Sequence, residues 1–139
     1  MPLKPLPTDL EILNEVYETY YDEFATQPTD SRSAWIPIDI ERIANKLSID
    51  VDVVFGRLHF YLEHKFKKRD EGTSLFQLNV GEKKNCINFP LMSSILAELR
   101  KEDERHWWAW ALSIASAIIA GLSLALSIVS LLITTNRPG

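Results

Sequence analysis

Three histidines and one cysteine are the residues with which this chain could hold a metal ion. His59 and His64 are five residues apart, so on a helix they point in different directions and do not share a metal. The interval also differs from that of the zinc protease motif, whose histidines are four residues apart. The third histidine, His106, is isolated, and Cys86 has no second cysteine beside it. The sequence therefore predicts no metal site.

The motifs typical of common enzyme classes are also missing. There is no glycine-rich loop that would cradle phosphate groups and no nucleophile elbow. Acidic residues are plentiful, but no predicted cleft brings two of them together for acid–base chemistry. We therefore predict that the chain is not an enzyme and uses no cofactor. The single cysteine, Cys86, cannot form a disulfide within the chain, which agrees with a reducing compartment.

The longest apolar stretch covers residues 107–135 and contains no charged side chain. About 20 predominantly apolar residues are enough for a helix to cross the hydrocarbon core of a bilayer, and this stretch is longer. A core helix in an oligomer is the alternative, but the rest of the chain is too short to surround such a helix. We predict one transmembrane helix at 107–135, preceded by a juxtamembrane helix at 101–106 and followed by a short tail at 136–139.

Three tryptophans, Trp107, Trp108 and Trp110, cluster at the first end of this stretch. Amphipathic aromatic rings favour the headgroup zone of a membrane, so we expect these residues to lie at the interface. Membrane lipid is therefore the first partner that the sequence predicts.

Basic residues on the two sides of the stretch predict its orientation. Arg100, Lys101 and Arg105 lie shortly before it, whereas Arg137 alone follows it. Because lysine and arginine set topology by remaining in the cytoplasm, we expect residues 1–106 to be cytoplasmic, at an inner or plasma membrane. The chain opens with Met-Pro-Leu-Lys rather than with an apolar segment, so we expect no cleavable signal peptide.

Small residues recur along one side of the predicted membrane helix. The first stripe has one every fourth position: Ser113, Ala117, Gly121 and Ala125. A second, more polar stripe lies nearby: Ser116, Ala120, Ser123, Ser127 and Ser130. Small faces let helices approach closely in a bilayer, so we expect a homo-oligomer formed through the first stripe. Alanine and serine are also common in such helices without any role, and a serine-rich face could instead line a small pore.

Residues 8–100 contain enough apolar and aromatic side chains for one small domain, which a tail at 1–7 precedes. Its charge is unevenly distributed. Residues 8–30 include acidic side chains but no lysine or arginine, whereas basic side chains predominate in 53–69. We expect an electrically polar domain, with an acidic face that is either simply solvated or a docking face for a basic partner.

The domain has the patterning of mixed helices and strands. A capping box at Thr8 and Glu11 opens an amphipathic helix that we expect to reach Ala25. A short strand at 34–38 is expected at a sheet edge, because Pro37 cannot donate to a neighbouring strand. Further on, we expect helices at 40–47 and 51–66, a hairpin of strands at 75–80 and 86–89, and a helix that Pro90 opens. The predicted fold class is therefore α+β.

The order of these elements is helix, strand, helix, helix, hairpin and helix. Apolar residues of the second and third helices and of the turn between them are Ile43, Ala44, Leu47, Ile49, Val54, Leu58 and Leu62. In this order and spacing, residues 8–100 resemble the winged helix-turn-helix family, with Ala44 at the small position where two helices approach closely. The resemblance implies a small winged-helix domain, followed here by one transmembrane helix.

The resemblance also implies a contact surface. In winged-helix proteins the helix corresponding to 51–66 enters the major groove of DNA, and the hairpin contacts the backbone. The positions carried over for binding nucleic acid or another partner are Arg57, Phe60, His64, Lys67, Lys68, Arg69, Lys83 and Lys84. Asp50 and Asp52 depart from this pattern, because acidic groups at that end of the helix repel phosphate. Winged helices also serve as protein-docking modules, so DNA and a cytoplasmic protein both stay open as partners.

Three functions fit these features. The first is a membrane-tethered winged-helix regulator or adaptor, which self-associates through its membrane helix so that linked domains bind by avidity. This layout resembles that of one-component regulators with a winged helix before a single span, except that almost no chain follows the span. The second is a small membrane effector, toxin- or defence-like, whose clustered helices perturb the bilayer. The third is an anchor subunit of a larger complex. No small-molecule substrate is indicated.

Overall fold

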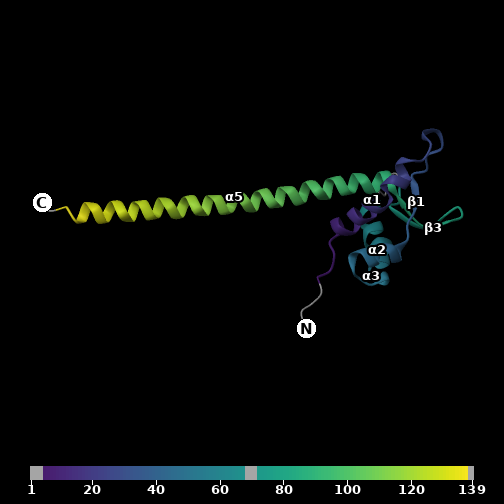
Figure 1. Ribbon diagram of the computed structural model, residues 1–139, viewed down its shortest axis with the longest axis horizontal. Helices are drawn as coiled ribbons and strands as arrows, with labels where there is room; N and C mark the ends of the chain where they lie inside the picture. Colours follow the sequence, from purple (N-terminus) through teal and green to yellow (C-terminus); the bar gives the residue numbers. More distant parts are fainter. Residues whose placement is uncertain (1–4, 68–71, 138–139) are drawn as a thin grey trace. The chain divides into compact units, whose positions relative to one another are not determined.

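The computed structural model describes residues 5–67 and 72–137 (Figure 1). These residues form two compact units, Met1–Arg100 and Lys101–Gly139, here called unit 1 and unit 2. Unit 1 combines helices with a three-stranded antiparallel sheet, and a long apolar helix, α5 (Phe89–Thr135), ends the described chain. The predicted α+β class is confirmed at this level of detail.

Helix α1 (Asp9–Ala25) begins at the predicted capping box. The Thr8 backbone N–H donates to Glu11 Oε2 at 2.6 Å, and the Glu11 N–H donates to Thr8 Oγ1 at 3.2 Å. These two bonds satisfy backbone donors that a helix start leaves without intrahelical partners. Ile12, Leu13 and Val16 are fully buried, so the helix packs on the core through the predicted face.

The next elements are the one-turn helix η1 (Thr29–Ser31), strand β1 (Trp35–Pro37) and helix α2 (Ile40–Leu47). Asp39 caps α2 as predicted, accepting a hydrogen bond from the Arg42 N–H at 3.2 Å. The Asp39 N–H donates in turn to the Tyr20 hydroxyl at 2.7 Å. Because Tyr20 belongs to α1, this bond fixes where the chain turns from the strand into α2.

The segment predicted as one helix over 51–66 is divided into three parts. It consists of α3 (Val51–Gly56), the π-helix η2 (Arg57–Leu62) and α4 (Glu63–Phe66). The Glu63 N–H donates to the Leu58 carbonyl five residues earlier, the bond that defines a π-helical turn. The expectation of an uninterrupted α-helix is therefore wrong in its middle, where a wider turn keeps Leu58 and Leu62 in the core.

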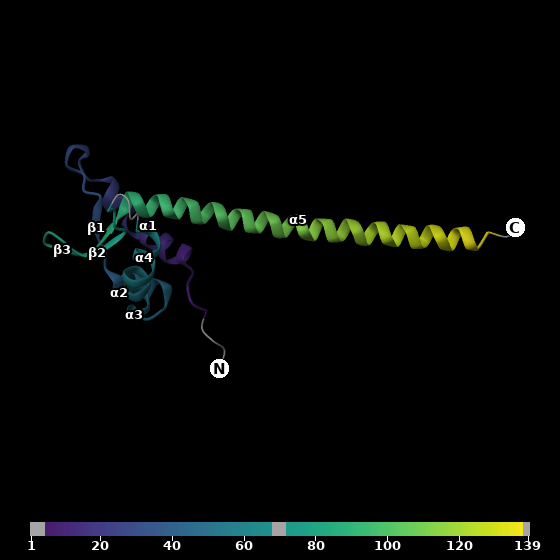
Figure 2. The ribbon, with the colours of Figure 1, turned by 180° about the vertical axis from the view of Figure 1, so that it is seen from behind.

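The turn between α2 and α3 spans residues 48–50 and begins with Ser48 in the left-handed conformation, at φ 55°. A three-residue turn between two helices is typical of helix-turn-helix units. Figures 1 and 2 show α2 and α3 side by side, and the turn of the β2–β3 hairpin projects from the rest of unit 1.

The sheet has the order β1-β3-β2, with β2 at Phe76–Val80 and β3 at Lys83–Asn88. The predicted hairpin is confirmed, although β3 starts three residues earlier than expected because Lys83 and Lys84 already pair with β2. Pro37 pairs with Cys86 from an edge strand, as its missing N–H predicts. Gly81 has φ 61° in the turn, a conformation that glycine adopts without steric cost.

A carboxylate fastens α4 to the sheet. Glu63 Oε2 accepts hydrogen bonds from the backbone N–H groups of Leu75 and Phe76, both at 2.7 Å. Helix α5 begins at Phe89, one residue before the predicted start, and its Phe89, Met92, Ile95 and Leu96 side chains close the core of unit 1.

Candidate membrane segment and interaction surface

Among residues 5–67 and 72–137, one helix is long and apolar enough to cross a membrane, namely α5. None of its most apolar 18-residue window is buried against the rest of the chain. Large aliphatic side chains such as Leu122 and Leu126 are 61% and 70% exposed. Soluble monomers rarely expose apolar patches of this extent, so these side chains need a cover that the described residues do not supply.

The tryptophans expected at a membrane interface lie together on unit 2. Trp107, Trp108 and Trp110 all have exposed side chains. The Trp107 and Trp108 rings meet edge to face, with centroids 5.6 Å apart and an interplanar angle of 84°. Indole rings in this position combine apolar area with an N–H donor, the combination that headgroup zones favour.

The first small-residue stripe, Ser113, Ala117, Gly121 and Ala125, is exposed along its whole length. A Cβ atom placed on Gly121 would meet no other heavy atom within 4 Å, so no part of the described chain fills that notch. The face is therefore open to the close approach of another helix.

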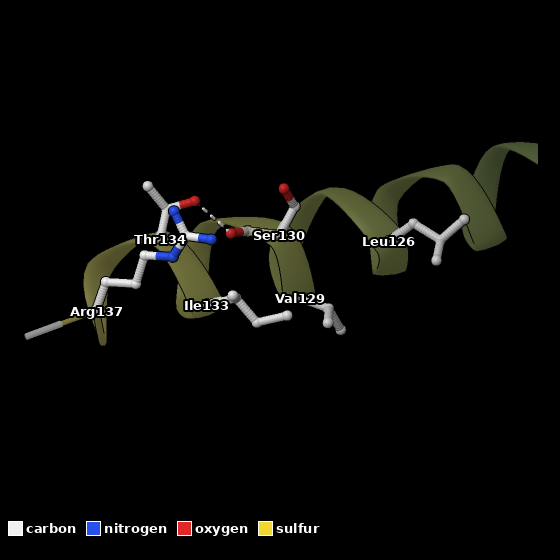
Figure 3. Close-up of a pocket in the computed structure, with 6 residues that line it drawn as sticks. All are labelled: Leu126, Val129, Ser130, Ile133, Thr134 and Arg137. Atoms are coloured by element: carbon white, nitrogen blue, oxygen red, sulfur yellow. Dashed lines mark hydrogen bonds between the residues drawn. The ribbon is translucent and has the colours of Figure 1, made fainter.

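Hydroxyl groups near the second stripe are satisfied within their own helix. Ser127 Oγ donates to the Ser123 carbonyl at 2.9 Å, and Thr134 Oγ1 donates to the Ser130 carbonyl at 2.8 Å. Figure 3 shows the second of these bonds, with the Arg137 guanidinium turned back along the helix toward Thr134. Hydroxyls bonded in this way can face lipid or another helix without an unpaired donor.

On unit 1, the most exposed of the predicted binding residues in η2 is Phe60. Its side chain is 70% exposed, and its ring lies 4.7 Å from the His59 ring and 6.1 Å from the Phe55 ring, measured between centroids. His59 in turn contacts Phe76 at 6.0 Å. His59 Nδ1 is buried and has no hydrogen-bond partner in the part of the chain that the structure describes. The sequence did not predict this aromatic cluster, which joins η2 to β2; we call it the Phe60 cluster.

Arg57, predicted as a base-reading residue, is engaged by groups near the start of α1. Its guanidinium forms an ion pair with Asp9 and also donates to the Pro7 carbonyl at 3.2 Å. Lys65 Nζ reaches the other Asp9 oxygen at 3.2 Å, and this hydrogen bond raises the pKa of Lys65 above 10.5, against a smaller lowering by desolvation. Asp9 therefore joins the start of α1 to both η2 and α4. Sequence reasoning missed this triad because its members are 48 and 56 residues apart.

The other basic positions are distributed over separate elements. His64 and Lys67 are exposed at the end of the α3–η2–α4 segment, and Lys83 and Lys84 are exposed on β3. Lys67 lines a depression of about 310 Å³ together with Phe66, Leu91, Ser94, Ile95, Glu98 and Lys65. Lys68 and Arg69 lie outside the described residues.

Side chains that could ligate a metal ion do not gather into a site among the described residues. Within 5–67 and 72–137, no group of three or more histidine, cysteine, aspartate or glutamate side chains could hold a metal ion. Cys86 is fully buried, and this burial raises the pKa of its thiol above 9.0. A buried, protonated thiol is a poor nucleophile, so Cys86 acts as a core residue.

Comparisons with known proteins leave these features to be interpreted from the molecule itself. No protein-family model, no curated protein and no solved structure matches the chain.

Proposed function

We propose that this protein is a membrane-tethered adaptor whose unit 1 docks a cytoplasmic protein while α5 spans a bilayer. The observation that carries the proposal is the contrast within α5. Its residues 89–96 contribute buried side chains to unit 1, whereas the apolar stretch at 107–135 is not buried. A helix that is apolar on all sides over this length is suited to lipid, and the exposed tryptophans at its start support that use.

The arrangement of unit 1 supports the winged helix-turn-helix assignment. Its element order is the one that the resemblance implies, and a three-residue turn separates α2 from α3. Ala44 is fully buried at the position where the family needs a small residue. Strand β1 pairs with β3, which anchors the base of the hairpin to the rest of the unit.

A protein partner is favoured over DNA by what the surface of η2 offers. Arg57, the one strong base-reading side chain expected there, is held by Asp9. The exposed Phe60 ring instead offers apolar area on a packed aromatic base, which suits the buried centre of a protein interface. Asp50 and Asp52 at the start of α3 would repel phosphates and would not hinder a neutral or basic protein surface.

DNA binding is the second candidate, because Lys83 and Lys84 are exposed on the hairpin that contacts the DNA backbone in winged-helix proteins. Either use would gain from self-association of α5 through the Ser113–Ala117–Gly121–Ala125 stripe. Two tethered copies would convert a weak contact into avid binding.

The test is a binding assay with the full chain in lipid nanodiscs. Titration with random duplex DNA across a salt series should give no saturable binding. A photoreactive residue at Phe60 should instead give a protein adduct from cytoplasmic extract, whereas the same residue at Glu41, exposed on α2, should give none. DNA binding that weakens steeply with salt, and less steeply after Lys83→Ala and Lys84→Ala, would contradict protein docking and favour the second candidate.

A further inference from the structure

The three tryptophans of unit 2 share a depression with ionisable side chains. This depression has a volume of about 360 Å³ and is lined by Asp103, Glu104, His106, Trp107, Trp108 and Trp110. All six residues belong to one helix, so the geometry of that helix decides how their side chains meet.

Helix spacing places an acidic residue next to each of the first two tryptophans. Side chains four residues apart are neighbours on a helix, and long side chains lean toward its N-terminal end. This spacing makes Asp103 a neighbour of Trp107 and Glu104 a neighbour of Trp108 on the helix surface. The two rings are nearly perpendicular, with an 84° interplanar angle and centroids 5.6 Å apart. Two nearly perpendicular indole rings and two acidic residues therefore line the same depression.

Such a site attracts a cation. The faces of indole rings carry negative electrostatic potential and bind cations within about 6 Å of the ring centroid. The nearest basic residue along the chain, Arg105, lines a different depression together with Glu102 and His106. Across the described chain, the cations that do contact aromatic rings are Arg32, Arg57, Lys65 and Arg100, and their rings are tyrosines and phenylalanines.

We propose that this depression binds a quaternary ammonium group, such as the choline of a phospholipid headgroup. A trimethylammonium group is bulky and cannot donate hydrogen bonds, so aromatic faces and a nearby carboxylate suit it better than a set of oxygen acceptors. The tryptophans begin the apolar stretch, at the level where lipid headgroups would lie if α5 spans the bilayer. The lipid source of the ligand therefore rests on the proposed function.

The experiment uses the full chain in phosphatidylglycerol vesicles, which contain no ammonium group. Tetramethylammonium chloride replaces sodium chloride at constant ionic strength, and tryptophan fluorescence is the readout. We expect a saturable change. Glu104→Gln or Trp107→Leu should each raise the half-saturating concentration about five-fold, the effect of losing roughly 1 kcal/mol of cation binding. Glu102→Gln removes the same charge two residues away, outside the depression, and should leave the titration unchanged.

The proposal is overturned if the change does not saturate, if Glu102→Gln weakens it as much as Glu104→Gln, or if the neutral choline analogue 3,3-dimethylbutan-1-ol gives the same response. Phosphatidylcholine vesicles identify the source of the ligand. A site already occupied there indicates the lipid headgroup, and a full response indicates a soluble ammonium compound. Co-flotation of the chain with the vesicles, measured on the same samples, tests the proposed function separately. A chain that floats without a saturable response overturns the ammonium site alone.

Discussion

Leu58 and Leu122 are the same type of residue on helices of the same chain, yet Leu58 is fully buried and Leu122 is 61% exposed. The contrast holds for the two units as a whole. Unit 1 gathers buried aliphatic side chains into a core and pairs several of its charges, such as Asp9 with Arg57 and Lys65. In unit 2 the aliphatic side chains have no core to enter. Unit 1 therefore has an internal source of stability, whereas the apolar part of unit 2 needs an external one.

The largest expected difference in stability comes from making the same leucine-to-alanine substitution separately in each unit. Leu58→Ala should lower the free energy of unfolding of unit 1 by about 2–5 kcal/mol, because it removes buried methyl groups and leaves a cavity. Leu122→Ala should change it by less than about 0.5 kcal/mol, because Leu122 contacts no core. Urea unfolding of the full chain in nanodiscs, followed by amide hydrogen exchange in α1, measures both. Equal effects would show that the two units share one core.

The next effect concerns the carboxylate that joins α4 to β2. Glu63→Gln keeps one oxygen acceptor but removes the charge that strengthens two 2.7 Å hydrogen bonds, so unit 1 should lose about 1–3 kcal/mol. The matched control is Glu82→Gln, an exposed glutamate in the hairpin turn, which should have almost no effect. A similar loss from both variants would mean that net charge, rather than the α4–β2 contact, is responsible.

A smaller effect is expected from the ion pairs that Asp9 forms with Arg57 and Lys65. Asp9→Asn should cost about 1 kcal/mol, because partly exposed ion pairs contribute modestly. The raised pKa of Lys65 gives this loss a pH dependence. The Lys65 contribution is fully present below pH 10.5, the ordinary pKa, and is lost as pH rises through the raised pKa. The difference in free energy of unfolding between wild type and Asp9→Asn should therefore narrow above pH 10.5. The contribution of the Asp9–Arg57 ion pair should remain. A difference that widens with pH would contradict the assignment.

The smallest effect on stability should come from the residue proposed for docking. Phe60→Ala removes an exposed ring, so unfolding of unit 1 should change by only about 0.5 kcal/mol. Partner binding should instead be lost, because a central aromatic residue commonly dominates a protein interface. Calorimetry of the unfolding transition measures the first effect. Capture of the partner identified by cross-linking, on nanodiscs that carry wild type or Phe60→Ala, measures the second. Loss of folding in this variant would show that the Phe60 cluster is a structural feature.

Some features of the fold can be predicted from the sequence, and others cannot. The start of α1, the cap of α2 and the edge position of Pro37 were predictable, because each depends on residues within a few positions of one another. The apolar stretch was predictable from its composition. The π-helical turn of η2 was not, because ordinary helical spacing of Leu58 and Leu62 gives no sign of a wider turn. The Asp9 triad and the hydrogen bonds of Glu63 depend on how distant segments pack, which spacing along the chain does not encode.

The residues of the candidate interaction surface also differ in how far the sequence predicts them. The exposure of Phe60 and of Lys83 agrees with the positions carried over from the winged-helix resemblance. Arg57 was carried over to the same surface, but its packing against Asp9 engages it within the chain. A surface position on a helix can be inferred from periodicity, whereas the partner that a charged side chain finds within the fold cannot.

The most direct test of the account is whether the apolar stretch is held in a bilayer. The full chain, mixed with lipid vesicles and extracted with alkaline carbonate, should float with the lipid. A variant with Leu122→Lys and Leu126→Lys should be extracted, because two charges near the middle of a spanning helix are costly in hydrocarbon. Release of the unmodified chain into the soluble fraction, at the same level as this variant, would contradict the membrane-tethered function.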